Sequence, residues 1–279
     1  MVGQTAAQGT QEALLLDARG QSNAAFSLEA VDFALVLGTA RVSASGGAQR
    51  LVGDGNVQTF LLGNQNDTIS AGGGHDRIQA GGGTNQIDGG AGIDTARYAT
   101  SAVNAVVKVN SDGSVSVTTA QATDTLRNVE VLRFDDGIRL LSTATQTSQG
   151  VTIQEDFYLA QNLDVAAAVK AGVFQSGAEH FAKFGRAEGR DASAVFDTAW
   201  YLSQNADVAT AVRAGSITAY DHFVTFGWKE GRNPSVWFDT KAYLAANIDA
   251  AASGLNPLTY FLTHADGRTA AAADTGLWG

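Results

Sequence analysis

The sequence predicts a mainly β solenoid, a parallel β-roll, followed by a small all-α repeat domain. Three observations carry this prediction. A nine-residue period runs through residues 44–97, strand-forming runs flank it on both sides, and beyond residue 146 a helical motif returns every 42 to 43 residues. We therefore expect two domains, with the solenoid over residues 1–145 and the helical repeats over residues 146–279.

Glycine-rich turns and one large apolar residue per unit set the nine-residue period. Residues 71–79 read AGGGHDRIQ, residues 80–88 read AGGGTNQID and residues 89–97 read GGAGIDTAR, with weaker units over residues 44–70. The eighth position of the units is apolar throughout: Leu51, Phe60, Ile69, Ile78, Ile87 and Ala96. Short strands that coil and stack on one another produce this pattern. A flexible glycine linker would not keep an apolar residue at a fixed spacing.

These units resemble the nonapeptide repeat of RTX proteins, whose pattern is G-G-x-G-x-D-x-U-x with U a large apolar residue. The resemblance implies a parallel β-roll with two nonapeptides per turn and calcium bound between turns. Glycine tolerates a positive φ and lets backbone carbonyls converge, while an acidic side chain adds negative charge. Calcium takes about six to eight oxygens, more than a single turn can supply.

In the geometry of that family, the sixth residues of units eighteen positions apart share one ion. The implied pairs are Asp76 with Asp94, Asp67 with Asn85, Gln58 with Asp76, and Gln49 with Asp67. Only the first pair holds two acids, so we expect the best site there, a weaker site at the second pair and the weakest upstream. The alternative, above all for residues 44–61, is a metal-free solenoid held by its apolar ladder.

The expected calcium ligands are the sixth residues of the best-matching units and the glycines at their second and fourth positions. They are Asp67, Asp76, Asn85, Asp94, Gly72, Gly74, Gly81, Gly83, Gly90 and Gly92. The calcium ion, Ca2+, is the one cofactor that this pattern predicts.

Flanking strands are predicted on both sides of the repeats. Residues 13–17 and 25–44 hold short apolar runs, which we interpret as an irregular start of the same solenoid that caps its open edge. On the other side, Asp112-Gly113 predicts a hairpin turn, and residues 124–141 predict a strand pair around Asp135-Asp136-Gly137. We interpret those two acids as a solvated turn rather than a catalytic carboxylate pair.

The strand pair also resembles the segment that follows many RTX blocks, N-V-E-x-L-x-F-x-D-G. The matching residues are Asn128, Val129, Glu130, Leu132, Phe134, Asp136 and Gly137. Residues 142–154 are small and polar, which predicts a linker to the second domain.

The second domain holds three copies of a helical repeat, the third of them degenerate. The first copy covers residues 157–190 and the second residues 200–232, each reading Y-L-x-x-N-x-D-V-A and later H-F-x-x-F-G-x-x-E-G-R. This unit resembles a repeat near the ends of exported bacterial RTX and other surface proteins. We expect Asp164 and Asp207 to be helix N-caps and Gly172 and Gly215 to follow the helix ends.

Two motifs of the helical repeat have alternative interpretations. His180 and His222 could be zinc ligands, but no further ligand is spaced with them, so we favour buried or capping histidines beside phenylalanines. The Glu-Gly-Arg triplets at residues 188–190 and 230–232 could bind an acidic sugar, and the favoured interpretation is a turn with an ion pair.

The composition limits the partners and the location of the protein. A net charge of −10 argues against nucleic acid and anionic membranes, and the absence of cysteine excludes disulfides and thiolate chemistry. No transmembrane segment and no N-terminal signal peptide are expected. The RTX resemblance implies type I secretion through an uncleaved C-terminal signal that includes residues 271–279, and therefore an extracellular or cell-surface location.

The two repeat systems use nearly every residue, and neither H-E-x-x-H nor G-x-S-x-G occurs. We therefore expect no enzyme but a secreted calcium-binding structural protein of the bacterial surface or extracellular matrix. We expect it to form homo-oligomers, a sheet or a filament, through residues 150–279, with tryptophans such as Trp228 and Trp237 exposed. The alternative is a monomeric adhesin that binds a surface polysaccharide. The export tail of a split enzyme is a third, less favoured interpretation.

Overall fold

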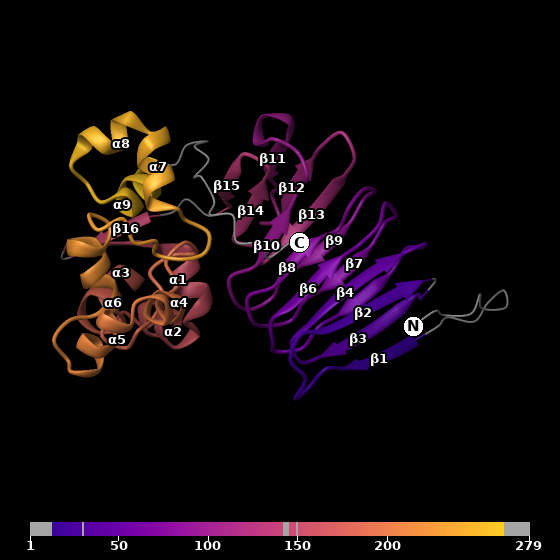
Figure 1. Cartoon of the computed structure of the whole chain (residues 1–279), viewed down its shortest axis with the longest axis horizontal. Coiled ribbons are helices and arrows are strands. Elements are labelled where there is room, and N and C mark those ends of the chain that lie inside the picture. Colours follow the sequence, from indigo (N-terminus) through magenta and orange to yellow (C-terminus); the bar gives the residue numbers. More distant parts are fainter. Residues whose placement is uncertain (1–12, 30, 142–144, 149, 265–279) are drawn as a thin grey trace. The chain divides into compact units, whose positions relative to one another are not determined.

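The computed structural model describes residues 13–29, 31–141, 145–148 and 150–264 (Figure 1). The chain divides into two compact units, Met1–Asp135 and Asp136–Gly279. The first unit is a β-solenoid of about 5 turns and the second contains the helices, which confirms the predicted fold class. The export signal expected at residues 271–279 lies outside the described residues.

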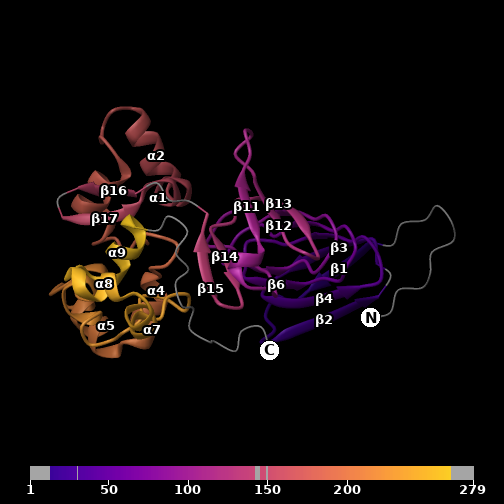
Figure 2. The same ribbon diagram turned by 90° about the horizontal axis from the view of Figure 1, so that it is seen from above.

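Two sheets form the solenoid, and Figure 2 shows them as separate layers. One sheet has the order β1-β3-β5-β7-β9-β13-β12-β11, and the other has the order β15-β14-β10-β8-β6-β4-β2. The first sheet contains β1 (Ala13–Asp17), β3 (Phe33–Leu37), β5 (Arg50–Val52), β7 (Thr68–Ser70), β9 (Gln86–Asp88), β11 (Val106–Val109), β12 (Val115–Thr118) and β13 (Thr123–Arg127). The second contains β2 (Ala24–Glu29), β4 (Ala40–Ser45), β6 (Gln58–Leu61), β8 (Arg77–Gln79), β10 (Thr95–Arg97), β14 (Val131–Phe134) and β15 (Gly137–Leu140).

The nine-residue period sets the register of the roll. Ile69 pairs with Ile87 in one sheet and Phe60 with Ile78 in the other, so strands eighteen residues apart lie side by side and parallel. Two nonapeptides therefore complete one turn, as expected. The eighth-position side chains are all buried between the sheets. Each large one contributes about 1.5–3 kcal/mol relative to an exposed position.

The flanking strands extend the same two sheets. At the N-terminal end the pairing leaves the regular offset, as Ala13 with Phe33 and Ala24 with Ala40 show, so the start of the solenoid is irregular as predicted. The hairpin around Gly113 joins β11 to β12, and this glycine has a φ of 81°. Asp135 is exposed, and its Oδ1 lies 3.8 Å from the Arg97 guanidinium nitrogen Nη2, which agrees with a solvated turn.

The predicted linker over residues 142–154 is wrong for its described part. Strands β16 (Thr145–Ser148) and β17 (Val151–Gln154) form an antiparallel hairpin. The apolar residues Val151 and Ile153 are buried, and the backbone of Thr152 exchanges hydrogen bonds with the Tyr220 hydroxyl at 3.2 and 3.1 Å. The small polar residues of this segment suggested a linker, but its strands pack against the helical repeats.

Three helical copies follow the hairpin. Their helices are α1 (Glu155–Gln161), α2 (Leu163–Lys170), α3 (Gly177–His180), α4 (Thr198–Gln204), α5 (Ala206–Arg213), α6 (Ala219–His222), α7 (Thr240–Ala246), α8 (Ile248–Ser253) and α9 (Pro257–Thr263). In the first two copies the third helix continues into a π-helical turn, Phe181–Gly185 and Phe223–Gly227. The tyrosines that begin each copy are fully buried: Tyr158, Tyr201 and Tyr243.

The helix ends differ in part from the expectation. Asn162 and Asn205, not Asp164 and Asp207, occupy the N-cap positions of α2 and α5. The two aspartates lie in the first turn, where they bind arginines. Gly172 and its counterpart in the second copy do follow the helix ends, with φ values of 75° and 69°, as predicted.

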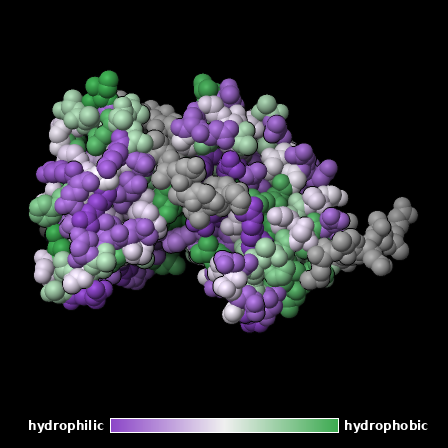
Figure 3. Space-filling view, in the orientation of Figure 1, coloured by the Kyte–Doolittle hydropathy of each residue, from purple (hydrophilic) through white to green (hydrophobic). Residues whose placement is uncertain are grey.

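The expected exposure of the tryptophans is also wrong in part. Trp237 is only 5% exposed, and Trp228 is half-buried with its Nε1 donating to the Val224 carbonyl at 3.1 Å. Among the described residues of this unit, the exposed aromatic side chains are instead Phe184 and Phe226, at 49% and 51%. Figure 3 shows hydrophobic side chains interspersed with polar ones over the surface of the helical unit.

Candidate calcium sites

The turns that join the strands stack into two columns, one along each edge of the roll. Five of the six sixth-position residues directly precede a strand and Gln58 begins one, so the parallel register brings residues of units eighteen positions apart together. One column contains Gln58, Asp76 and Asp94, and the other contains Gln49, Asp67 and Asn85. All six side chains are buried.

Hydrogen bonds connect each of the four predicted pairs. The backbone N–H of Gln58 donates to Asp76 Oδ1 at 2.6 Å, and the N–H of Asp76 donates to Asp94 Oδ1 at 2.8 Å. In the other column the N–H of Gln49 donates to Asp67 Oδ1, and that of Asp67 to Asn85 Oδ1, both at 2.8 Å. One side-chain oxygen of each acceptor residue thus binds the turn above it.

The second carboxylate oxygen of each aspartate indicates a candidate cation site. The Oδ2 atoms of Asp67, Asp76 and Asp94 are buried and have no hydrogen-bond donor in the part of the chain that the structure describes. Burial raises the pKa of Asp76 to about 8, with the neighbouring Asp94 adding to the shift, and burial raises the pKa of Asp94 to about 7. An orphaned buried carboxylate is costly, and a bound Ca2+ would offset that cost.

The glycines allow the turns to approach closely. The six glycines of the expected site all have positive φ: Gly72, Gly74, Gly81, Gly83, Gly90 and Gly92. A Cβ on Gly92 would lie 1.6 Å from the Gly74 carbonyl oxygen, and one on Gly90 would lie 1.9 Å from that of Gly72. Only glycine fits where a carbonyl of one turn contacts the Cα of the next. Backbone carbonyls therefore line the same columns as the carboxylates.

This donor set fits calcium. Among the described residues no three acidic, histidine or cysteine side chains are placed so that they could hold one metal ion together, so most ligands of an ion would be backbone oxygens and water. Ca2+ accepts such a mixture of carboxylate, carbonyl and water oxygens. The pair Asp76 and Asp94 would supply two negative charges to the best site. The pair Asp67 and Asn85 would supply one negative charge to the weaker site in the other column. The chemistry that calcium adds is electrostatic cross-linking of adjacent turns.

Two acidic residues that were not among the expected calcium ligands stand at the next position of these columns. Asp124 Oδ1 accepts a hydrogen bond from the Asn85 N–H at 3.2 Å, and Glu130 Oε2 accepts one from the Asp94 N–H at 2.9 Å. Asp124 is the second residue of β13 and Glu130 directly precedes β14, and each is followed two residues later by a buried leucine, in the patterns D-T-L-R and E-V-L-R. This D-x-U-x pattern was the signal that could have identified them.

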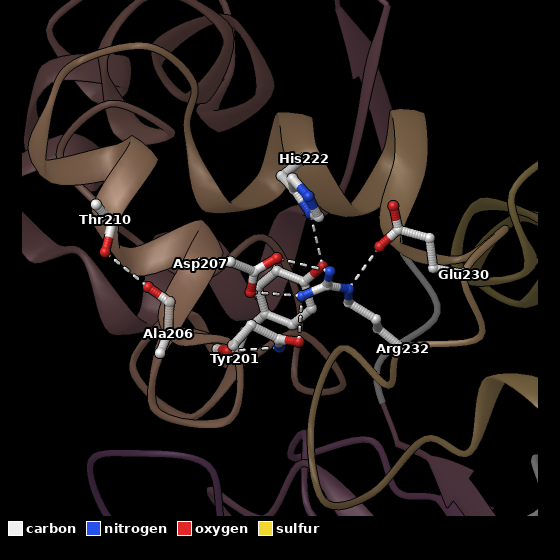
Figure 4. A network of polar contacts seen from close by, with 8 residues as sticks. Tyr201, Ala206, Asp207, Thr210, His222, Glu230 and Arg232 are labelled. Atoms are coloured by element: carbon white, nitrogen blue, oxygen red, sulfur yellow. Dashed lines mark hydrogen bonds and ion pairs between the residues drawn. The ribbon is translucent and has the colours of Figure 1, made fainter.

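The histidines of the helical unit are structural. Figure 4 shows His222 beside the Tyr201 hydroxyl, at 2.9 Å from Nδ1, and His180 meets Tyr158 in the same way. Both rings also contact phenylalanines. The described residues supply no additional ligands for zinc.

The Glu-Gly-Arg triplets form turns with ion pairs, as the favoured interpretation expects. In the second copy Arg232 binds Asp207 at 2.7 Å, Glu230 at 2.6 Å and the Asn205 side chain at 2.8 Å (Figure 4). Arg190 repeats the arrangement in the first copy. The guanidinium groups are therefore already bound to acidic side chains of their own repeat.

Comparisons with known proteins agree with this geometry. Residues 62–96 match the family model described as RTX calcium-binding nonapeptide repeat (4 copies). No curated protein and no solved structure matches the chain. Among the described helices none has the length and apolarity needed to cross a membrane. The chain therefore carries a block of RTX calcium-binding nonapeptide repeats, coiled as a β-solenoid and followed by a helical region.

Proposed function

We propose that the protein is a secreted calcium-binding structural protein without catalytic activity, which assembles with copies of itself at the bacterial surface or in the extracellular matrix. The observation that carries the proposal is the orphaned Oδ2 of Asp76 beside Asp94 in the glycine-lined column. Calcium would fix the stacked turns and make the roll a rigid element.

The expected weakness of most of the sites supports the extracellular location in this proposal. Only one of the four predicted pairs holds two carboxylates, so the others would bind calcium weakly. Sites of that kind fill at the millimolar calcium found outside cells. The RTX repeats support the same location.

Self-association is assigned to the helical unit. Six large apolar side chains in the described part of this unit are exposed: Leu163, Val173, Phe184, Phe226, Ile248 and Leu255. Phe184 and Phe226 occupy the same position in two copies of the repeat, so they offer the same contact twice. Exposed aromatic residues of this kind are enriched in protein interfaces. They replace the tryptophans as the basis for assembly into a sheet or filament.

Light scattering of the full chain tests the assembly. We expect large particles at millimolar calcium and a monomer after chelation. The double variant Phe184→Ser, Phe226→Ser should stay small in calcium, whereas Val106→Ser, Val109→Ser, which removes two exposed apolar residues of the solenoid, should assemble normally. A monomer of the unaltered protein at high concentration in calcium would overturn self-assembly.

The exposed phenylalanines also favour one second candidate, a monomeric adhesin that stacks them on a surface polysaccharide. Its signature is a protein that remains monomeric in calcium and binds polysaccharide with an affinity that Phe226→Ser lowers. Assembly that is insensitive to polysaccharide would reject it.

A further inference from the structure

The column that contains Asp76 and Asp94 continues past the last matched nonapeptide. Strand β14 pairs with β10 so that Val131 lies beside Thr95, which places Glu130 beside Asp94. The Oε2 atom of Glu130 accepts the Asp94 N–H at 2.9 Å. Asp94 makes the same contact with Asp76 at 2.8 Å. Glu130 thus takes the sixth position of one more turn.

Asp94 has an unsatisfied oxygen that faces this additional turn. Its side chain is completely buried, and its Oδ2 has no donor among the residues that the structure describes. A Cβ built on Gly89 would lie 2.6 Å from Asp94 Oδ2 and 2.1 Å from the Asn128 carbonyl oxygen. Both oxygens therefore face the space beside the Gly89 Cα, although neither can donate a hydrogen bond to the other.

The backbone of Asn128 has the conformation that glycine has in the regular turns. Its φ is 48°, in the left-handed region, and it stands two residues before Glu130 just as Gly92, with a φ of 133°, stands two residues before Asp94. Asparagine enters this region more readily than most residues. In the short turn between β13 and β14, Asn128 therefore takes the fourth position of a nonapeptide and Glu130 takes the sixth. The sequence of this turn no longer matches the repeat pattern.

We propose that Asp94, Glu130 and the Asn128 carbonyl form a further calcium site at the C-terminal end of this column, beyond the matched repeats. Two carboxylates and a carbonyl are hard oxygen donors, which Ca2+ binds together with water and further backbone oxygens. The charge of this site equals that of the Asp76 and Asp94 pair. The site would clamp the strand pair β14–β15 to the last nonapeptide.

The other column ends differently, and the contrast supports the assignment. Strand β13 pairs with β9 so that Thr125 lies beside Gln86, which places Asp124 beside Asn85. Here the Asn85 Nδ2 donates to Asp124 Oδ1 at 2.7 Å, and the Tyr98 hydroxyl donates to Asp124 Oδ2 at 3.0 Å. Both carboxylate oxygens have a protein donor, so amide and hydroxyl hydrogens stand where a cation would. The proposed additional site therefore belongs to one column alone.

A purely structural role for Glu130 is the competing explanation, because its carboxylate accepts the Asp94 N–H. The variant Glu130→Gln separates the two explanations. Glutamine keeps an acceptor oxygen of the same reach but loses the charge that holds calcium. The matched control is Asp124→Asn, which removes one charge at the same level of the other column and keeps an acceptor and a donor for its neighbours.

Equilibrium dialysis of the full chain with calcium, and metal analysis of the protein, tests the proposal, which rests on the proposed function. We expect Glu130→Gln to bind one ion fewer than the unaltered protein, or to bind one ion at least tenfold more weakly, and Asp124→Asn to bind the full number. An unchanged isotherm for Glu130→Gln beside a calcium-binding unaltered protein overturns this inference alone. Failure of the unaltered protein to bind calcium overturns the proposed function as well.

A calcium-loaded crystal of the unaltered protein provides a test that does not depend on the folding of a variant. We expect anomalous density for an ion about 2.3–2.6 Å from Asp94 Oδ2, from a Glu130 oxygen and from the Asn128 carbonyl. Density at the Asp76 and Asp94 pair with none at Glu130 would contradict the proposed site.

Discussion

The carboxylate of Asp94 accepts a hydrogen bond from the backbone N–H of Asp76 at 2.8 Å, eighteen residues earlier, and so ties two turns of the roll together. One oxygen of each side chain serves the fold in this way, while the Oδ2 atoms remain buried with no donor among the described residues. The same side chains that set the register therefore accumulate unsatisfied acceptor oxygens along the column. We therefore expect the stability of the roll to depend on a cation.

Removing one acidic side chain should weaken the effect of calcium. A ligand present at a hundred times its dissociation constant stabilises the folded state by about 2.7 kcal/mol. We expect Asp76→Asn to reduce the calcium-induced gain by at least about 1.4 kcal/mol, a tenfold loss of affinity. Urea unfolding with and without calcium measures it. Asp112→Asn, in an exposed turn where Ser114 and Arg127 bind the carboxylate, is the control and should keep the full gain.

The metal-free roll should be more stable in mild acid than in mild alkali. Burial raises the pKa of Asp76 to about 8 and that of Asp94 to about 7, from an ordinary value of 3.8. A raised folded-state pKa stabilises the protein fully below about pH 4, and this contribution is lost as the pH rises through about 7 to 8. Calcium competes with these protons, so its affinity should rise over the same interval.

Urea midpoints of the chelated protein between about pH 5.5 and 8.5 test this dependence, because the ion-paired aspartates titrate below that range. The midpoint should fall with rising pH, and the fall should be smaller in Asp76→Asn. A midpoint that rises with pH in the absence of metal would mean that these carboxylates are not buried as the structure has them.

Close contact between turns should make one glycine indispensable. Gly92 has a φ of 133°, and a Cβ there would lie 1.6 Å from the Gly74 carbonyl oxygen. Backbone strain and overpacking together should cost Gly92→Ala about 2–5 kcal/mol of unfolding free energy. Gly55→Ala is the control, since a Cβ there would meet no atom within 4 Å, and we expect a change below about 0.5 kcal/mol. Equal thermal stability of the two variants would contradict the stacked-turn geometry.

Replacing the arginine of the first or second helical copy by lysine should destabilise the protein. Arg232 binds Asp207, Glu230 and Asn205 at once, and its side chain is only 26% exposed. Lysine cannot form the bidentate contact, so Arg232→Lys should lower the unfolding free energy by about 1–2 kcal/mol. Thermal unfolding measured by helical circular dichroism checks the value. Arg213→Lys, at an exposed position of the same unit, should change it by less than about 0.5 kcal/mol.

Local sequence patterns were enough to predict the solenoid and the pairing of its sixth-position residues. The nonapeptide spacing determines which residues pair, and so Asp76 and Asp94 could be paired from their positions in the chain alone. Glu130 could not be placed in that way, because it lies 36 residues after Asp94 and its position depends on how β14 joins the sheet. The burial of Trp237 is likewise a tertiary property that its own sequence neighbourhood does not reveal.

The helix caps show a different limit. Asn162 and Asp164 are both good N-cap residues, two positions apart, so propensity alone could not choose between them. The choice depends on Arg190, which binds both side chains from more than twenty residues away. A contact of that range is invisible to local pattern analysis.

The central claim, that acidic side chains in the stacked turns bind calcium, is tested most directly by a calcium titration of the chelated full chain. We expect a saturable gain of β circular dichroism at up to millimolar calcium, which magnesium does not reproduce because it requires stricter octahedral coordination. The double variant Asp76→Asn, Asp94→Asn should lose most of this response. Identical spectra of the unaltered protein with and without calcium, together with no bound metal by elemental analysis, would contradict the claim.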